Sequence, residues 1–229
     1  MSVPAVEDVP STWGTKLLYA GTRVMSAPLL TLGFSLRTRP AKTKIPAGPL
    51  LIIANHQSFL DPPLVGLAFD RPLVYLARKT LFENPFFRAL IRGLNAVPID
   101  QDGIGKDGLR AILEQLSLGR AVLVFPEGTR SPDGRVHPLR PGIHLLIKRT
   151  TAPIVPVGIA GAYDAWPSWR KYPIPSPLFL PPTPRTIGVA VGDPLDPRPF
   201  AQMPREDAMV ALGNELDRMR GVADGIRRT

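Results

Sequence analysis

Short apolar runs alternate along this chain with segments in which apolar residues recur at helical spacing. Six runs have the length and composition of strands buried on both faces of a sheet, and they lie at residues 50–54, 73–77, 96–99, 121–125, 154–159 and 187–191. Between and after them, helices are predicted at 62–69, 85–92, 107–118 (capped by Asp107), 142–149 and from Pro204 onward. This alternation predicts an α/β fold with a mostly parallel sheet flanked by helices.

Another helix is expected near the N-terminus, where apolar and basic side chains separate onto two faces. Trp13, Leu17 and Val24 fall on one face, and Lys16 and Arg23 share another. An aromatic and aliphatic face with a basic flank is typical of a helix that lies in a membrane surface. A helix that packs on the domain would also fit this pattern.

The distribution of charge favours an anionic partner. The 229 residues include 28 Lys and Arg against 19 Asp and Glu, for a formal net charge of +9, which would suit either nucleic acid or anionic lipid. Between Val9 and Leu60 there are cations but no acidic residue, as in segments that are attracted to anionic lipid. We therefore expect residues 1–44 to be a membrane-associating segment, 45–229 to be a single domain, and nucleic acid not to be a partner.

The apolar segments are too short to span a bilayer. The uncharged run 24–36 has 13 residues and includes Pro28, whereas a spanning helix needs about 20 residues. The N-terminus does not resemble a cleavable signal peptide, because its apolar part comes late and no clear small-residue cleavage site follows. The absence of cysteine excludes disulfides and thiolate metal ligands. These features predict a peripheral or monotopic membrane protein.

Candidate catalytic residues follow the first predicted strand. His56 comes directly after the apolar run and Asn55, and Asp61 follows five residues later. Histidine is the usual general base near neutral pH, and a carboxylate bonded to it fixes its tautomer and stabilises the imidazolium that forms. The pair could therefore deprotonate a substrate hydroxyl. Ser58 as a nucleophile is a weaker alternative, because no Gly-x-Ser-x-Gly turn exposes it.

A second polar cluster follows the predicted strand 121–125 and could bind an anion. Arg130 presents a planar fork suited to phosphate, Gly128 permits close backbone approach, and Thr129 adds a hydroxyl. Glu127 could accept a hydrogen bond from a substrate hydroxyl or hold Arg130. Because sites in parallel sheets form at the carboxyl ends of the strands, we expect the two clusters to meet there.

The two clusters read Asn-His-x4-Asp at residues 55–61 and Phe-Pro-Glu-Gly-Thr-Arg at 125–130. In this order and at this separation they resemble the signatures of the 1-acylglycerol-3-phosphate (lysophosphatidic acid) acyltransferase family. The resemblance implies a glycerol-3-phosphate acyltransferase-like fold and transfer of a fatty acyl group from acyl-CoA or acyl-carrier protein to a lysophospholipid. The expected acceptor is 1-acyl-sn-glycerol-3-phosphate, acylated to phosphatidic acid at the cytoplasmic face of a membrane, with no cofactor and no metal.

The same resemblance assigns substrate contacts to individual residues. It places the glycerol phosphate of the acceptor on residues 127–130, and Lys79, in the segment Arg-Lys-Thr-Leu-Phe, becomes a second phosphate ligand. Arg140 stands where the family usually has a basic residue. Gln101 stands where the family usually has arginine, which leaves the acceptor headgroup open.

Three other functions have weaker support in the sequence. His56, Asp61, His137 and His144 are of metal-binding types but lack the spacing of a metal motif. Residues 103–108 read Gly-x-Gly-x-x-Gly, as in dinucleotide-binding proteins, and would serve equally as a loop between a strand and a helix. A non-catalytic membrane- or nucleic-acid-binding protein on this fold would not require a histidine and carboxylate pair.

Residues 163–185 contain seven prolines together with Trp166, Trp169, Tyr172 and Phe179. This proline content predicts a long irregular loop. Such a loop could touch lipid or be an ordinary surface loop.

Overall fold

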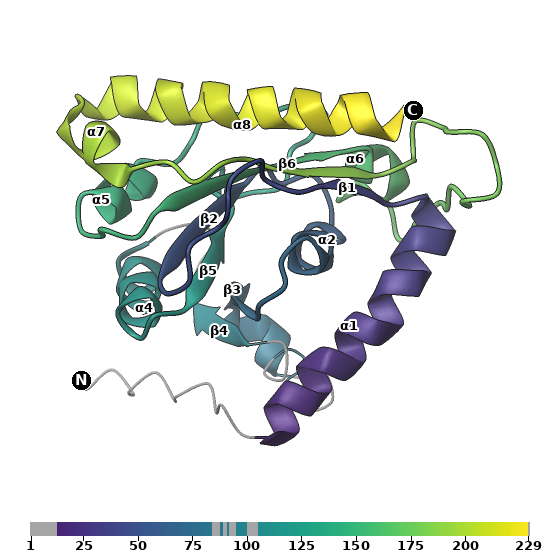
Figure 1. Ribbon diagram of the computed structural model, residues 1–229, viewed down its shortest axis with the longest axis horizontal. Coiled ribbons are helices and arrows are strands. Elements are labelled where there is room, and N and C mark those ends of the chain that lie inside the picture. Colours follow the sequence, from purple (N-terminus) through teal and green to yellow (C-terminus); the bar gives the residue numbers. More distant parts are fainter. Residues whose placement is uncertain (1–12, 84–87, 89–90, 92–94, 100–104, 229) are drawn as a thin grey trace.

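The computed structural model describes residues 13–83, 88, 91, 95–99 and 105–228, and a seven-stranded sheet forms its centre (Figure 1). The strands are β1 (Arg37–Arg39), β2 (Leu50–Ala54), β3 (Leu73–Arg78), β4 (Ala96–Ile99), β5 (Ala121–Val124), β6 (Ile154–Ala160) and β7 (Gly188–Val191). Their order is β1-β7-β6-β2-β5-β3-β4, and every neighbouring pair is parallel except β6 with β7. The predicted mostly parallel sheet is confirmed.

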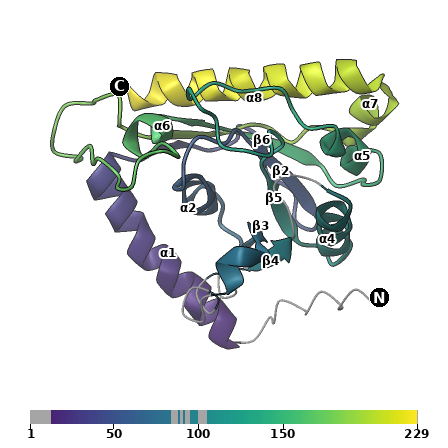
Figure 2. The same ribbon diagram turned by 180° about the vertical axis from the view of Figure 1, so that it is seen from behind.

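Helices cover both faces of the sheet (Figures 1 and 2). One face carries α1 (Trp13–Phe34) and α2 (Asp61–Leu67), and the other carries α4 (Lys106–Ser117), α5 (Gly142–Ile147) and α8 (Arg205–Arg227). The short elements are η1 (Lys79–Phe82), α6 (Ala162–Ala165) and α7 (Pro197–Gln202).

The central strand β2 explains this three-layer arrangement. Its alternate side chains point to opposite faces: Leu50 and Ile52 join the cluster with α1 and α2, while Leu51 and Ile53 join the cluster with α4, α5 and α8. All five residues of β2 are buried. An uninterrupted apolar run is therefore what this position requires.

The predicted helix boundaries differ from the structure in several places. Of the helix expected at 85–92, only Arg88 and Ile91 are described, and both are helical. The predicted cap Asp107 is wrong: Gly105 is the N-cap of α4, and Asp107 lies in the first turn, where its charge still complements the helix dipole. The short elements β1, α6 and α7 were not predicted.

The N-terminal helix α1 runs past Pro28 to Phe34, and its last turns are anchored by buried Leu30 and Phe34. Arg23, expected on the basic flank of this helix, bonds within the protein. Its guanidinium donates to the backbone carbonyls of Gly66 at 3.0 Å, Leu67 at 3.4 Å and Phe69, and it pairs with Asp70. A cation here satisfies the carbonyls that the end of α2 leaves unpaired.

Part of the expected segment 1–44 belongs to the folded core. Arg37 pairs in parallel with Gly188, so that β1 extends the sheet, and the N–H of Thr43 donates to Asp193 at 2.8 Å. The core therefore begins before residue 45. Among the described helices, none combines the length and the apolar character that crossing a bilayer requires.

The close approach of α8 to the sheet depends on a glycine in β6, which leads to a prediction about stability. A Cβ at Gly158 would lie 2.0 Å from the backbone carbonyl carbon of Met219. We expect Gly158→Ala to lower the free energy of unfolding by about 1–3 kcal/mol, the usual cost of overpacking. Urea denaturation would measure the change. Gly213→Ala, a glycine of α8 itself with open space around its Cβ, is the matched control; equal midpoints for the two variants would contradict the prediction.

Candidate active site

The two sequence clusters meet because their strands are neighbours. Ile53 of β2 pairs with Val124 of β5 in parallel register, so the residues that follow the two strands emerge at one edge of the sheet. Beside this edge lies a cavity of about 880 Å³, and His56, Gly128, Thr129 and Arg130 contribute to its wall. The expected meeting of the clusters is confirmed, and the volume is within the usual range of a ligand site.

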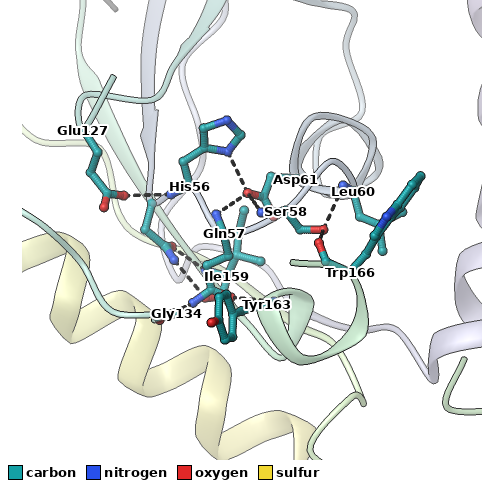
Figure 3. A network of polar contacts seen from close by, with 11 residues as sticks. His56, Gln57, Ser58, Leu60, Asp61, Glu127, Gly134, Ile159, Tyr163 and Trp166 are labelled. Atoms are coloured by element: carbon teal, nitrogen blue, oxygen red, sulfur yellow. Dashed lines mark hydrogen bonds and ion pairs between the residues drawn. The ribbon is translucent and has the colours of Figure 1, made fainter. Parts of the chain in front are cut away.

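His56 and Asp61 form a hydrogen-bonded pair (Figure 3). The Nδ1 atom of His56 lies 2.8 Å from Oδ2 of Asp61, whose side chain is fully buried. The backbone N–H groups of Gln57 and Ser58 donate to the same oxygen. These donors hold the carboxylate in place. The backbone of the turn between His56 and Asp61 thus binds the Asp61 carboxylate.

The ring of His56 is held from a second side. It stacks on Phe125, with ring centroids 4.0 Å apart and an interplanar angle of 17°. With Nδ1 committed to Asp61, the neutral imidazole carries its proton there and presents Nε2 as the acceptor. Because His56 lines the cavity, this nitrogen is suited to accept a proton from a hydroxyl bound there.

Glu127 positions the main chain of His56. Its Oε1 accepts the backbone N–H of His56 at 2.8 Å, and its Oε2 accepts the backbone N–H of His137 at 2.9 Å. The N–H of Ser131 donates to the carbonyl of His56 at 2.7 Å. Burial raises the pKa of the Glu127 carboxyl, and the N–H groups of His137 and His56 partly oppose that rise.

This geometry differs from the expectation that Glu127 contacts a glycerol hydroxyl or Arg130. Both of its oxygens are already bonded to backbone amides, and Glu127 is buried and absent from the described residues that line the cavity. Contacts between residues seventy positions apart leave no local pattern, so sequence reasoning missed this role.

Asn55 joins the site to a third strand and was also missed as a positioning residue. Its side-chain amide donates to the carbonyl of Ile159 at 3.0 Å and accepts the N–H of Ile159 at 2.7 Å. The pair continues the ladder between β2 and β6 beyond the point where β2 ends. A polar residue that directly follows an apolar run was the available signal.

Ser58 is engaged in a way that disfavours a nucleophilic role. Its hydroxyl donates to the carbonyl of Trp166 at 2.7 Å and accepts the N–H of Leu60 at 3.2 Å. The side chain is buried. It holds the turn that precedes α2.

Arg130 and its neighbours form the polar part of the cavity wall. Gly128 has φ +77°, a backbone conformation that favours glycine, and this turn directs Thr129 and Arg130 toward the cavity. The Arg130 guanidinium carbon lies 3.8 Å above the ring of Phe59, which in turn contacts Trp166 at a centroid distance of 5.2 Å. Stacking of this kind orients the planar fork.

Two other predicted substrate contacts, Lys79 and Arg140, are absent from the described wall of the cavity. Lys79 is exposed in η1, and its neighbour Thr80 lines the cavity instead. Arg140 donates from Nε to the carbonyl of Glu127 at 3.3 Å, behind the turn. Gln101 and residues 103–104 of the glycine-rich segment lie outside the described residues.

The histidines proposed for a metal site are separated. His137 bonds Asp133 at 2.8 Å on the surface, while His144 is buried in α5. In the described part of the chain, no three His, Asp or Glu side chains gather in a way that would hold a metal ion.

Comparison with known proteins identifies the class. A family model described as acyltransferase matches residues 38–160, more than half of the chain. The 1-acyl-sn-glycerol-3-phosphate acyltransferase of Bacillus subtilis is 27% identical over 178 residues, covering 77% of this chain and 82% of that protein. A protein of the same description from Pseudomonas aeruginosa is 33% identical over 136 residues, or 56% of this chain and 51% of its own length.

A solved structure is similar as well. The crystal structure of the 1-acyl-sn-glycerophosphate (LPA) acyltransferase PlsC from Thermotoga maritima gives a TM-score of 0.70 at 26% identity, covering 92% of this chain and 78% of that one. This chain belongs to the acyltransferase family, and it is an enzyme of that class.

Removing either member of the histidine and carboxylate pair should abolish most of the activity. We expect His56→Ala to reduce the rate of acyl transfer by about 10²–10⁴-fold, as for loss of a general base. Asp61→Asn should be similarly impaired, because an amide can stabilise the wrong tautomer. Release of thiol from an acyl thioester measures both. A His56→Ala variant that retains more than half of the wild-type rate would refute the assignment.

Replacing Glu127 should change catalytic rate and folding stability in different ways. Glu127→Gln leaves an amide NH₂ facing one of the two backbone N–H groups, so His56 should shift, and we expect kcat to fall by at least about tenfold. Since folding raises the pKa of this carboxyl above its ordinary value of 4.5, its contribution to stability is present at acid pH and is lost as pH rises through the folded-state pKa.

The stability of Glu127→Gln relative to wild type should therefore improve as pH rises above 4.5 and through the raised folded-state pKa of Glu127. Urea denaturation at several pH values, together with kcat, measures both effects. A variant with wild-type kcat would show that Glu127 does not position His56.

Proposed function

We propose that this enzyme acylates the free hydroxyl of 1-acyl-sn-glycerol-3-phosphate, using a fatty acyl thioester, to give phosphatidic acid. One observation supports this most directly: a general base, His56, and a phosphate-binding fork, Arg130, lie in the wall of the same cavity. The names of the relatives from Bacillus subtilis and Thermotoga maritima agree with this acceptor.

The geometry accounts for the chemistry in two proton transfers. Nε2 of His56 takes the proton of the acceptor hydroxyl as its oxygen attacks the thioester carbonyl. Asp61 holds Nδ1–H and stabilises the imidazolium. When the tetrahedral intermediate collapses, the carbon–sulfur bond breaks and the imidazolium returns the proton to the thiolate. Transfer is direct, with no acyl-enzyme, since the nearby hydroxyl of Ser58 is engaged by Trp166 and Leu60.

The rest of the cavity is suited to the acyl part of the substrates. Its wall includes apolar residues of α2 and β3, among them Pro62, Leu67 and Leu76. Acyl-CoA and acyl-carrier protein present the same thioester, and we propose either as donor. The cavity wall holds Arg130 but neither Lys79 nor Arg140, so we propose Arg130 as the ligand of the acceptor phosphate.

We further propose that the enzyme works as a peripheral protein on the cytoplasmic face of a membrane. The outward side of α1 exposes Leu17, Val24, Met25 and Leu29, which is the composition of an interfacial helix. Release of thiol by the vesicle-bound protein in the presence of a lysophospholipid tests whether the enzyme acts at the membrane.

The acceptor assignment predicts the behaviour of a conservative change at Arg130. Arg130→Lys keeps the charge but loses the planar fork, so we expect a loss of at least about tenfold in kcat/KM for the acceptor. The kinetic constants of the donor should change little. A panel of lysophospholipids with both donor types, read by product mass, tests the substrate. Preference for an acceptor without a phosphate monoester, or equal effects on donor and acceptor, would overturn the proposed role.

A further inference from the structure

The loop that follows α6 exposes large apolar side chains to solvent. Within residues 166–180, here called the aromatic loop, Trp169 and Tyr172 are each 68% exposed and Phe179 is 82% exposed, and Leu178 and Leu180 are exposed beside it. Figures 1 and 2 show this segment extending beyond the C-terminal end of α1. Single exposed apolar residues are ordinary, but a concentrated group marks an interaction site.

The charges in this region have one sign. From residue 165 to residue 192 the sequence contains no Asp or Glu, while Arg170, Lys171 and Arg185 are present. The guanidinium carbon of Arg170 lies 4.8 Å from the ring centroid of Trp169, and Nζ of Lys171 lies 5.3 Å from that of Tyr172. Aromatic rings next to cations are the side chains that anchor proteins at an anionic membrane interface.

The aromatic loop continues the exposed face of α1. The N–H of Ser176 donates to the carbonyl of Gly33 at 2.7 Å, and the N–H of Leu178 donates to the carbonyl of Leu32 at 3.0 Å. Leu32 and Leu178 are both exposed, and Leu29 lies one turn earlier on the helix. Two stretches of sequence without acidic residues, 9–60 and 165–192, therefore adjoin on the surface.

The loop has a defined conformation despite its exposure. The indole N–H of Trp166 donates to the carbonyl of Arg170 at 3.0 Å, and the N–H of Ile174 donates to the carbonyl of Ala165 at 2.8 Å. Its prolines restrict the backbone further. A surface that is ordered in advance loses less conformational entropy when it binds.

We propose that the aromatic loop is a second membrane-docking element, which binds an anionic lipid surface together with α1. The proposal rests on the proposed function, since the loop begins at the cavity: Trp166 and Ser168 line it, and Trp169 follows directly. Docking through both elements places the cavity mouth, with Arg130 stacked on Phe59, at the level of the headgroups. A lysophospholipid then reaches His56 without leaving the bilayer surface.

A site-specific label tests whether the loop enters the interface. The chain has no cysteine, so Phe179→Cys places a polarity-sensitive dye on the loop. Val210→Cys, at an exposed position of α8 on the opposite face of the sheet, is the matched control. With vesicles of phosphatidylglycerol and phosphatidylcholine, the dye at 179 should shift to the blue and brighten, and the dye at 210 should not. Protein that sediments with the vesicles while the dye at 179 stays unchanged would overturn the proposal.

Partitioning of an unlabelled variant gives an independent readout. Trp169→Ser combined with Phe179→Ser should weaken sedimentation with these vesicles by at least about fivefold, because the apolar contribution to interfacial binding is lost. The control Val210→Ser should bind as wild type does. Unchanged binding of the double variant contradicts the proposal.

Measuring acyl transfer on monomeric and on vesicle-bound substrates distinguishes failure of the docking proposal from failure of the proposed function. Neither substituted side chain belongs to the described wall of the cavity, so the double variant should process short-chain, monomeric substrates at the wild-type rate and lose activity only on vesicle-bound acceptor. If the wild type transferred no acyl group to either substrate, the proposed function would be refuted. The dye and sedimentation measurements would still test membrane docking by the loop. The double variant could instead bind vesicles normally and lose activity only when acyl-carrier protein is the donor. The loop would then bind the acidic carrier protein, and the membrane proposal would be wrong.

Discussion

The catalytic geometry depends on how the backbone of one residue is held. His56 gives its N–H to Glu127 and receives the N–H of Ser131 at its carbonyl, and both partners come from the turn after β5. This arrangement is possible because β2 and β5 are parallel neighbours in register. With the main chain fixed, Asp61 and Phe125 need only set the rotation of the imidazole. The site is therefore preorganised by the sheet and does not rely on the mobility of loops.

Buried polar groups around this point also specify the topology. Asn55 bonds Ile159 through both atoms of its amide, which ties the catalytic turn to β6, while Glu127 ties it to β5. Each of these groups would be costly to bury without its partner. A sheet with another strand order would leave them unpaired. The same residues that position the base thus favour one arrangement of the central strands over its competitors.

Much of this could be predicted from the sequence, because the signals were local. Apolar runs located β2, β4 and β5 within a residue or two, and the spacing of His56 and Asp61 indicated a hydrogen-bonded pair. The errors share a different origin. Glu127 was expected to bond a glycerol hydroxyl or Arg130, and Arg23 to lie on a basic flank of its helix, yet each bonds groups more than forty residues away. A short peripheral strand such as β1 has too few residues to show a period.

The pairing of β1 has a consequence for how the protein is made. Arg37 reaches its partner Gly188 only after most of the chain has left the ribosome, and contacts between such distant residues form late because long loops must close. The N–H of Leu178 bonds the carbonyl of Leu32, so the last turn of α1 is also attached late, although Arg23 can bond residues 66–70 much earlier. If α1 binds a membrane as proposed, it can do so before the rest of the domain is complete. Membrane binding by α1 would then precede completion of the fold, and the domain would finish folding at the membrane surface.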